Sequence, residues 1–327
     1  MNSTPIAATA KYLAVTGLDE ASSRKVEIFR HKAPRIGRTE INMTNILFRS
    51  ASPKDIERLG TIAYEAFYKI STDHNFPSDL PTPEVGIGLA EMMIGREDIF
   101  SVVAENGKVL GSNFLWEADE IDGVGPITVD PADQNSSVGR ELMERVIQRS
   151  ADNGKAGIRL VQAAYHNRSL ALYTKLGFDV VEPLSAINGP QFTAEIEGRT
   201  VRSLASGDVE AANKLCIAAH GVSRKNEIAG AAKAGSGIVV ENDGKLSGYA
   251  TVLGFFGHAV TASNDDLKAL IGSGREIAGA GILLPTRNGD VLRWCFENGL
   301  RIVMPMSLMS KGYYQTPRSP FLPSILY

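Results

Sequence analysis

Cysteine is scarce in this sequence of 327 residues, which contains only Cys216 and Cys295. The two lie far apart and match neither a CxxC pair nor the ligand spacing of a zinc site. Such isolated cysteines are typical of buried, reduced thiols. The sequence therefore predicts no disulfide framework and no metal centre.

Long apolar runs are also missing, since none approaches the ~20 residues that a membrane-spanning helix needs, and no apolar secretory segment opens the chain. Charge of one sign does not dominate either, because 34 Lys+Arg against 37 Asp+Glu leave a net charge of -3. This balance gives no electrostatic reason to expect nucleic acid or an anionic membrane as a partner. We expect a cytoplasmic protein that binds neither.

The chain is longer than one hydrophobic core usually serves, so two domains are expected. Residues 1–45 stand apart, because they lack periodicity and contain more basic than acidic residues. An organellar targeting segment is one interpretation of residues 1–42, but their acidic residues count against it. We expect residues 1–45 to form a disordered extension.

Strand and helix patterns alternate from Ile46 onward. Asn106-Gly107 marks a hairpin, and Gly177 is expected to end a helix that Asn167 caps. We expect strands over residues 46–49, 100–104, 108–116, 124–129 and 157–163, with helices over 53–67, 85–94, 139–153 and 167–176. This alternation predicts an α/β fold with a mixed sheet.

Three landmarks of the first half recur, in the same order, in the second. Residues 49–55 resemble 202–208, the hairpin at 103–108 resembles 240–245, and residues 172–178 more faintly resemble 294–300. A shared order is not expected of chance similarity between hairpins. We therefore predict two copies of one unit, over residues 46–190 and 198–327.

A phosphate-binding site is predicted where the strand ending at Val129 meets the helix starting near Gly139. Backbone N–H groups at a helix N-terminus face outward unpaired, and the helix dipole favours an anion there. Gly139 permits close approach of a ligand, and Arg140 adds a positive charge. The loop lacks both GxxxxGK[ST] and GxGxxG, so it is neither a P-loop nor a dinucleotide fingerprint. An ordinary capped helix remains the alternative.

Gln134-x-x-Ser137-x-Gly139-Arg140 resembles the Q/R-x-x-G-x-G/A signature of the GNAT N-acetyltransferase superfamily. Residues 167–178 resemble that superfamily's second motif, about 30 residues further along. The resemblance covers about 145 residues and departs at Ser137, where the signature has glycine. It implies a mixed sheet whose central strands splay to admit acetyl-CoA. The cofactor-binding residues carried over are Ile127, Val129, Gln134, Asn135, Ser136, Ser137, Val138, Gly139, Arg140 and Asn167.

Tyr173 matches the tyrosine that in many members of the superfamily protonates the departing thiolate, so the resemblance implies that it is catalytic. Packing beneath the sheet is its alternative role. Val129 would polarise the thioester carbonyl through its backbone N–H. The general base is left open, because an ordered water can relay the proton. The candidates are Glu65, His74, Glu117, Asp119, Glu120 and Asp122.

The second copy lacks the phosphate-loop signature, and Cys295 stands at the position of Tyr173. We therefore expect two tandem GNAT-type acyl-CoA N-acyltransferase domains, of which the C-terminal one is degenerate. The expected activity is N-acetyl transfer from acetyl-CoA to a small-molecule or peptide amine, without a metal. A longer acyl donor and a non-catalytic acyl-CoA sensor are the alternatives. The acceptor's identity and the oligomeric state, including a homodimer, stay open.

Overall fold

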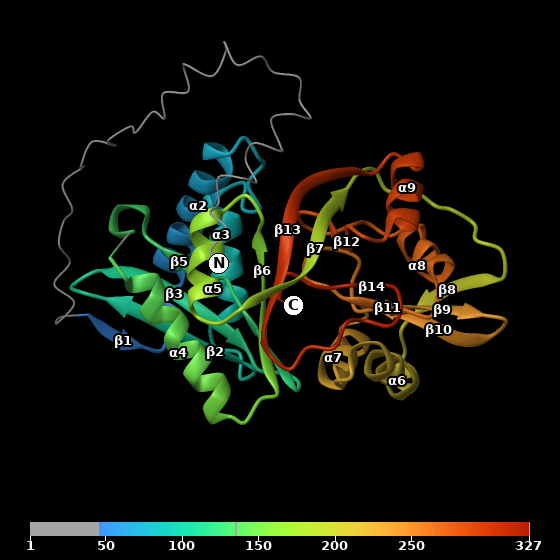
Figure 1. Cartoon of the computed structure of the whole chain (residues 1–327), viewed down its shortest axis with the longest axis horizontal. Coiled ribbons are helices and arrows are strands. Elements are labelled where there is room, and N and C mark those ends of the chain that lie inside the picture. The colour runs from blue at the N-terminus through green and yellow to red at the C-terminus, as the bar shows by residue number, and fades with distance from the viewer. Residues whose placement is uncertain (1–45, 135, 327) are drawn as a thin grey trace, which may run out of the picture. The chain divides into compact units, whose positions relative to one another are not determined.

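A computed structural model describes residues 46–134 and 136–326, so the predicted extension over residues 1–45 lies outside it. The described residues belong to one compact unit. The described residues form a 9-stranded sheet and a 5-stranded sheet with helices against them (Figure 1). This confirms the predicted mixed α/β fold. None of the described helices is long and apolar enough to span a membrane.

The first half follows the predicted alternation of strands and helices closely. Gly177 has a φ of 88°, as expected of a glycine that ends a helix. The elements are β1 (Leu47–Arg49), η3 (Pro53–Asp55), α2 (Ile56–Asp73), α3 (Pro83–Met93), β2 (Ile99–Glu105), β3 (Val109–Trp116), β4 (Ile121–Val124), β5 (Thr128–Val129), η4 (Pro131–Asp133), α4 (Val138–Asp152), β6 (Gly157–Ala163), α5 (Asn167–Lys175) and β7 (Asp179–Asn188).

The second half repeats this order, although it has no counterpart of η4 and its fourth strand is not divided. It ends with a short extra strand, β14. The elements are β8 (Arg199–Ser203), η5 (Ser206–Asp208), α6 (Val209–His220), α7 (Lys225–Ala234), β9 (Ile238–Asn242), β10 (Lys245–Ala250), β11 (Ala259–Thr261), α8 (Asn264–Ile271), β12 (Ile282–Pro285), α9 (Gly289–Glu297), β13 (Arg301–Gly312) and β14 (Phe321–Leu322).

One ion-pair arrangement occurs at the same place in both halves. Arg49, at the end of β1, lies 2.7 Å from Asp55 and 2.7 Å from Glu105. In the second half, Arg202 on β8 lies 2.7 Å from Asp208, and Glu241 of β9 is its other partner, also at 2.7 Å. Each arginine therefore ties the start of a helix to a neighbouring strand, which gives the sequence repeat a structural counterpart.

The two halves exchange strands at the centre of the large sheet. The sheet order is β1-β2-β3-β4-β6-β13-β7-β12, so β13 of the second half lies between β6 and β7 of the first. In return, β7 pairs with β12, from Ile187 opposite Ile282 to Leu184 opposite Pro285. The backbone hydrogen bonds of β6 on this side thus come from the second half. Figure 1 shows β6, β13 and β7 side by side.

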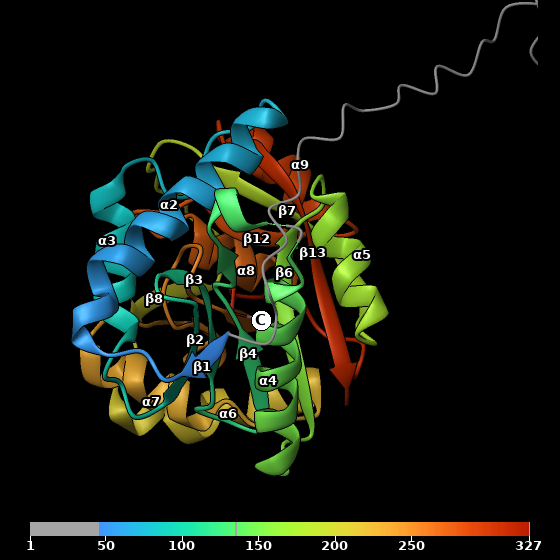
Figure 2. The same ribbon diagram turned by 90° about the vertical axis from the view of Figure 1, so that its left-hand side faces the viewer.

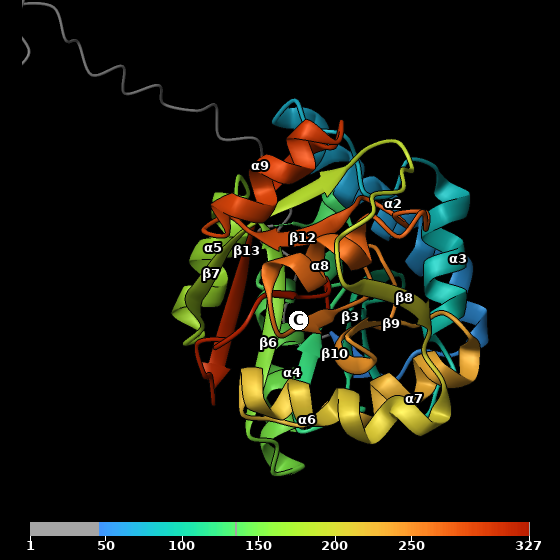
Figure 3. The ribbon, with the colours of Figure 1, turned by 90° about the vertical axis from the view of Figure 1, so that its right-hand side faces the viewer.

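Helices cover both faces of each sheet. Helices α4 and α5 lie on one face of the strands around β3, and α2 and α3 lie on the other (Figure 2). Their buried side chains form separate cores with the strands. In the second half α6 and α7 lie on one side of β9 and β10, with α8 on the opposite side (Figure 3). Successive residues along a strand therefore point into different cores, because side chains alternate between the two faces of a sheet.

The strand exchange predicts that the halves stay associated when the segment joining them is cut. Glu197 and Gly198 lie exposed in that segment, so a protease site can be inserted between them. After cleavage we expect the two fragments to elute together from a gel-filtration column, at the position of the uncut 35.1 kDa chain. Each fragment supplies a central strand to the other, and separating them would expose unpaired backbone groups.

A fragment that ends at Glu197 is the control, because it lacks β13. We expect it to be aggregated or unfolded by gel filtration and circular dichroism. Two folded fragments that separate after cleavage would contradict the exchange.

Candidate functional site

The predicted phosphate loop connects β5 to α4. Asp130 accepts a hydrogen bond from the backbone N–H of Ala132 and caps the short η4 helix. The 15-residue helix α4 then begins at Val138, and no side chain caps its N-terminus. Its first backbone N–H groups are therefore available to an anion, and the dipole of a helix this long favours negative charge there.

Ser137 has a φ of 67° and a ψ of -6°, which is the left-handed region. A non-glycine residue pays roughly 1–2 kcal/mol to adopt this conformation. This is the position at which the sequence departs from the glycine of the signature. The backbone keeps the glycine-type turn, and the serine side chain is exposed.

Gly139 lies where the protein itself would tolerate a larger residue. A Cβ atom added to it would be 3.6 Å from Cγ2 of Val129 and 4.0 Å from Cδ2 of Leu172, both ordinary van der Waals distances. Neither packing nor a positive φ requires glycine here. The missing side chain leaves a small cradle at the start of α4, which suits a ligand that approaches the backbone.

Further predicted cofactor residues lie in this loop or in the first turn of α4. Gln134 accepts a hydrogen bond from Arg168 at 3.1 Å and lies 3.4 Å from the carbonyl oxygen of Val129. Arg140 is exposed and pairs with Glu144 at 2.7 Å, so its guanidinium is already partly neutralised. Val138 is buried and can offer only its backbone. The side chain of Ser136 donates to Asp133, and Asn135 lies outside the described residues.

Asn167 is the first residue of α5, and His166 occupies the N-cap. The predicted capping role of Asn167 is therefore wrong by one position, an error that helix boundaries commonly show. The side chain of Asn167 is exposed at the start of α5.

The strands splay next to this loop. β4 pairs with β6 only from Ile121 to Gly123, opposite Gly157 to Arg159. Beyond that point the chain turns to pair with β3 as β5, with Val129 opposite Gly111. Between the described residues of β5 and the end of β6 there is no strand pairing.

Strand geometry fixes which backbone groups face this opening. Asp130 donates to Leu110 on β3, so the alternation of an antiparallel ladder directs the N–H of Val129 away from β3. On β6, Ala164 donates to Pro305 of β13, and the same alternation directs the N–H groups of Val161 and Ala163 away from β13, while the Ala163 carbonyl accepts from His166. The splay therefore presents unpaired backbone groups from both sides, including the Val129 N–H singled out by the sequence.

Tyr173 lies on α5 with 6% of its surface exposed, beside Phe178. Burial raises the pKa of its phenol to about 12, and a hydrogen bond with Ser169 lowers that pKa in part. Side chains on a helix lean toward its N-terminus. The hydroxyl is therefore directed toward the start of α5, which follows the splayed end of β6.

Two of the acidic residues considered as a general base, Asp119 and Glu120, contact the second half. The carboxylate of Asp119 accepts hydrogen bonds from the backbone N–H groups of Asn226 and Glu227, at the start of α7. The carboxylate of Glu120 accepts from the backbone of Ser223 at 3.3 Å. This turn thus caps a helix of the second half, which local sequence could not reveal.

The other candidates are also placed by the structure. Glu117 pairs with Arg149 at 2.8 Å, and the fully buried Asp122 lies 3.2 Å from Lys155. Glu65 is exposed, with Arg58 3.9 Å away. His74 alone contacts the end of β6, through Tyr165, with the two ring centres 5.3 Å apart.

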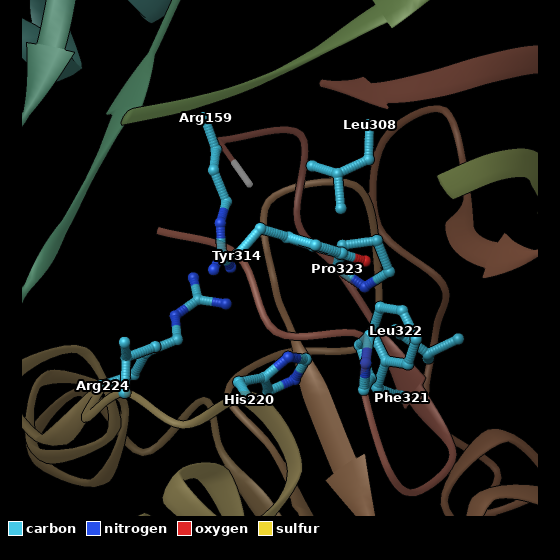
Figure 4. Close-up of a pocket in the computed structure, with 10 residues that line it drawn as sticks. Arg159, His220, Arg224, Leu308, Tyr314, Phe321, Leu322 and Pro323 are labelled. Atoms are coloured by element: carbon cyan, nitrogen blue, oxygen red, sulfur yellow. The ribbon is translucent and has the colours of Figure 1, made fainter. Parts of the chain in front are cut away.

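A small cavity lies elsewhere, on the face of β6 that meets the second half. Figure 4 shows the side chains of Arg159, Arg224 and His220 converging there, beside Tyr314 and Phe321. Its volume of about 10 Å³ holds about one water molecule. The cavity is therefore too small for a pantetheine arm. Nor do three or more His, Cys, Asp or Glu side chains of the described ranges gather to hold a metal ion.

The second half differs from the first at the equivalent place. Ser263 caps α8 by accepting a hydrogen bond from the N–H of Asp266, a buried acid of the first turn. One edge of β11 pairs with β10, and the other is occupied by β14, with Val260 opposite Phe321. Both the helix N-terminus and the strand edge that are open in the first half are therefore occupied here.

Helix α5 of the first half and helix α9 of the second are equivalent in length and in the position of their residues. Tyr173 and Cys295 are each third from the end of a 9-residue helix, α5 and α9. Gly177 and Gly299 follow these helices with φ values of 88° and 83°. The predicted correspondence of Cys295 with Tyr173 therefore agrees with the geometry. Cys295 is fully buried, and burial raises the pKa of its thiol to about 12, which makes it a poor nucleophile.

Comparison with known proteins gives one family and several similar folds. Residues 96–180 match the family profile of the acetyltransferase (GNAT) domain. A search of curated proteins gives no match. Among solved structures, a candidate acetyltransferase from Pyrococcus horikoshii is 17% identical with a TM-score of 0.63, covering 85% of this chain and 92% of that one.

A GCN5-related N-acetyltransferase from Sphaerobacter thermophilus is 16% identical with a TM-score of 0.55, covering 83% of this chain and 97% of that one. At these identities the likeness concerns the fold. Because the coverage is high on both sides, it extends over both halves of this chain.

The left-handed conformation of Ser137 predicts opposite effects for two substitutions. Ser137→Gly should raise the free energy of unfolding by about 0.5 kcal/mol, because relief of strain exceeds the entropy that glycine adds to the unfolded chain. Ser137→Val should lower it by about 1 kcal/mol, because a β-branched residue fits this region poorly. Urea unfolding of the three proteins measures both changes. A valine variant as stable as the glycine variant would contradict the assigned conformation.

Proposed function

We propose, from the premise that this chain contains a GNAT acetyltransferase domain, that it transfers an acetyl group from acetyl-CoA to an amine. The observation that carries the proposal is the opening between β5 and β6, which lies next to an uncapped helix N-terminus. An extended pantetheine arm can pair with the strand edges, while the pyrophosphate reaches the N–H groups of α4.

The residues of the loop fit such a donor. The missing side chain of Gly139 leaves room for the pyrophosphate, and the turn at Ser137 aims successive N–H groups outward. Gln134 and Arg140 border the same loop and Asn167 begins the neighbouring helix, so we retain all three as contacts of the donor. The N–H of Val129 would donate a hydrogen bond to the thioester carbonyl as negative charge develops on its oxygen.

Acyl transfer requires one new bond and one broken bond. The amine nitrogen attacks the carbonyl carbon, the carbon–sulfur bond breaks, and the thiolate sulfur needs a proton or a hydrogen bond. With a pKa of about 12, Tyr173 stays protonated at neutral pH. Its pKa exceeds the ~8.5 of a thiol, so stabilisation of the thiolate by a hydrogen bond is favoured over complete proton transfer.

The second half serves this reaction as a scaffold in our proposal. It repeats the order of elements, so we regard it as a degenerate tandem domain of the same type. Its capped helix α8 and the β14 strand on β11 leave no place for a second donor. The acceptor would be a small-molecule or peptide amine. The two buried free thiols support a reducing compartment such as the cytoplasm.

One substitution tests whether the protein is an enzyme or an acyl-CoA sensor. Tyr173→Phe should lower kcat for CoA release about 100-fold, because the thiolate loses its hydrogen bond. Acetyl-CoA binding, followed by calorimetry, should be unchanged because the loop is intact. Tyr68→Phe is the matched control, since Tyr68 is an exposed tyrosine on α2.

The wild-type protein should be assayed with a panel of aliphatic amines, amino acids and peptides. If acetyl-CoA binds tightly but no amine accelerates CoA release, the protein is a sensor and the proposed reaction is wrong. If Tyr173→Phe and Tyr68→Phe lower kcat equally, the role of Tyr173 is wrong.

A further inference from the structure

The loop that follows α2 packs against the end of β6. The rings of Phe76 and Tyr165 stack with centroids 4.3 Å apart and an interplanar angle of 6°. His74 contacts Tyr165 as well, with 5.3 Å between the ring centres. Leu80 anchors the loop with only 7% of its surface exposed. These contacts build an aromatic wall, defined here as His74, Phe76 and Tyr165.

Asp79 lies in this loop, close enough to the phenol of Tyr165 for the two to interact electrostatically. It is partly buried. Among the described residues, its carboxylate has no hydrogen-bond or ion-pair partner, yet its oxygens are not sealed from solvent. Burial raises the pKa of this carboxyl to about 6. A carboxylate that is shielded, accessible and without a partner is a common feature of ligand sites.

The position of this loop relates it to the acyl-transfer site. Tyr165 and His166 follow Ala164 after the end of β6, where β6 has separated from β5. The ring of His166 hydrogen-bonds Ser169 at 2.7 Å, and Ser169 in turn reaches the hydroxyl of Tyr173. Asp79 and Tyr173 thus interact with consecutive residues of the chain just after β6, Asp79 with Tyr165 and Tyr173 with His166 through Ser169.

We propose that Asp79 and the aromatic wall bind the acceptor as a protonated aliphatic amine, and that Asp79 removes its proton. The inference rests on the proposed acetyl transfer and names both the substrate class and the base. A carboxylate pairs with an ammonium group, and the rings accommodate the methylene chain that carries it. Sequence reasoning missed Asp79, although a loop rich in proline and aspartate marks its position.

The protons balance in this scheme. The ammonium gives one proton to the carboxylate of Asp79, and the neutral amine attacks the thioester. As the carbon–nitrogen bond forms and the carbon–sulfur bond breaks, the nitrogen loses a second proton and the thiolate gains one at sulfur. The proton on Asp79 passes to water. The net products are the acetamide, CoA and one proton.

The charged and titratable groups around Asp79 suit a cation. Tyr165 interacts with Asp79 itself, and His74 at the end of α2, with His166 and Arg168 around the start of α5, lie about the aromatic wall. Burial lowers the pKa of His166 to about 4, so this ring is neutral at pH 7. Arg168 donates to Gln134 at 3.1 Å, which draws its charge toward the phosphate loop. Among these residues, Asp79 is the one whose side chain carries a negative charge at pH 7.

The test compares Asp79→Asn with Asp73→Asn, because Asp73 is an exposed carboxylate at the end of α2 that pairs with Lys69. Pentane-1,5-diamine is titrated into each protein by calorimetry in the presence of CoA, and CoA release is measured between pH 5 and 9. Asp79→Asn should weaken diamine binding and lower kcat/KM about 100-fold, with acetyl-CoA binding unchanged. Asp79→Glu keeps the charge and should recover part of the activity.

The pH profile distinguishes a base from a structural residue. Activity of the wild-type protein should rise with pH through about 6, because Asp79 must be ionised. Asp79→Asn should lose this limb, and Asp73→Asn should keep it. The inference is overturned if the diamine fails to bind the wild type, or binds Asp79→Asn and Asp73→Asn equally. Diamine binding that depends on Asp79 without any CoA release would support the amine site and refute the transfer reaction.

Discussion

The backbone pairing along β6 is the constraint on which the site depends. One edge of this strand pairs with β13 from Gly157 to Ala163, and the other pairs with β4 only as far as Arg159. Full pairing on one edge lets the strand stay rigid while its other edge is open. Since β13 belongs to the second half, the first half cannot form this opening alone. The second half therefore contributes to the candidate site without supplying any of its predicted chemical groups.

The two halves share one order of elements but differ at the connection from a strand to the next helix. This connection is open between β5 and α4 and closed between β11 and α8. Both keep the arginine arrangement of Arg49 and Arg202, which fixes the start of a helix against its sheet. They differ past the third strand, where α4 is uncapped and α8 is capped by Ser263. The β14 strand then completes the edge of β11. The strand edge and helix N-terminus that are open in the first half are thus closed at the equivalent place of the second.

Local sequence predicted much of the fold, because most of its signals are short in range. The Asn106-Gly107 hairpin, the helix that ends at Gly177 and the repeat of landmarks all agree with the structure. The strand exchange could not be predicted, since β13 and β6 are far apart in sequence and nothing in either strand encodes the partner. The acidic turn was misjudged for the same reason, because Asp119 caps a helix more than 100 residues away. The conformation of Ser137 was predictable in principle, since the signature places glycine there.

Amide hydrogen exchange on adding acetyl-CoA tests the central claim most directly, namely that only the first half holds the donor. We predict slower exchange at Val129, at residues 136–140 and at Val161 and Ala163, with no change at residues 259–266. These are the amides that the opening and the uncapped α4 leave without partners, and their counterparts around α8. Protection around β11 and α8, or none between residues 129 and 140, would contradict the account.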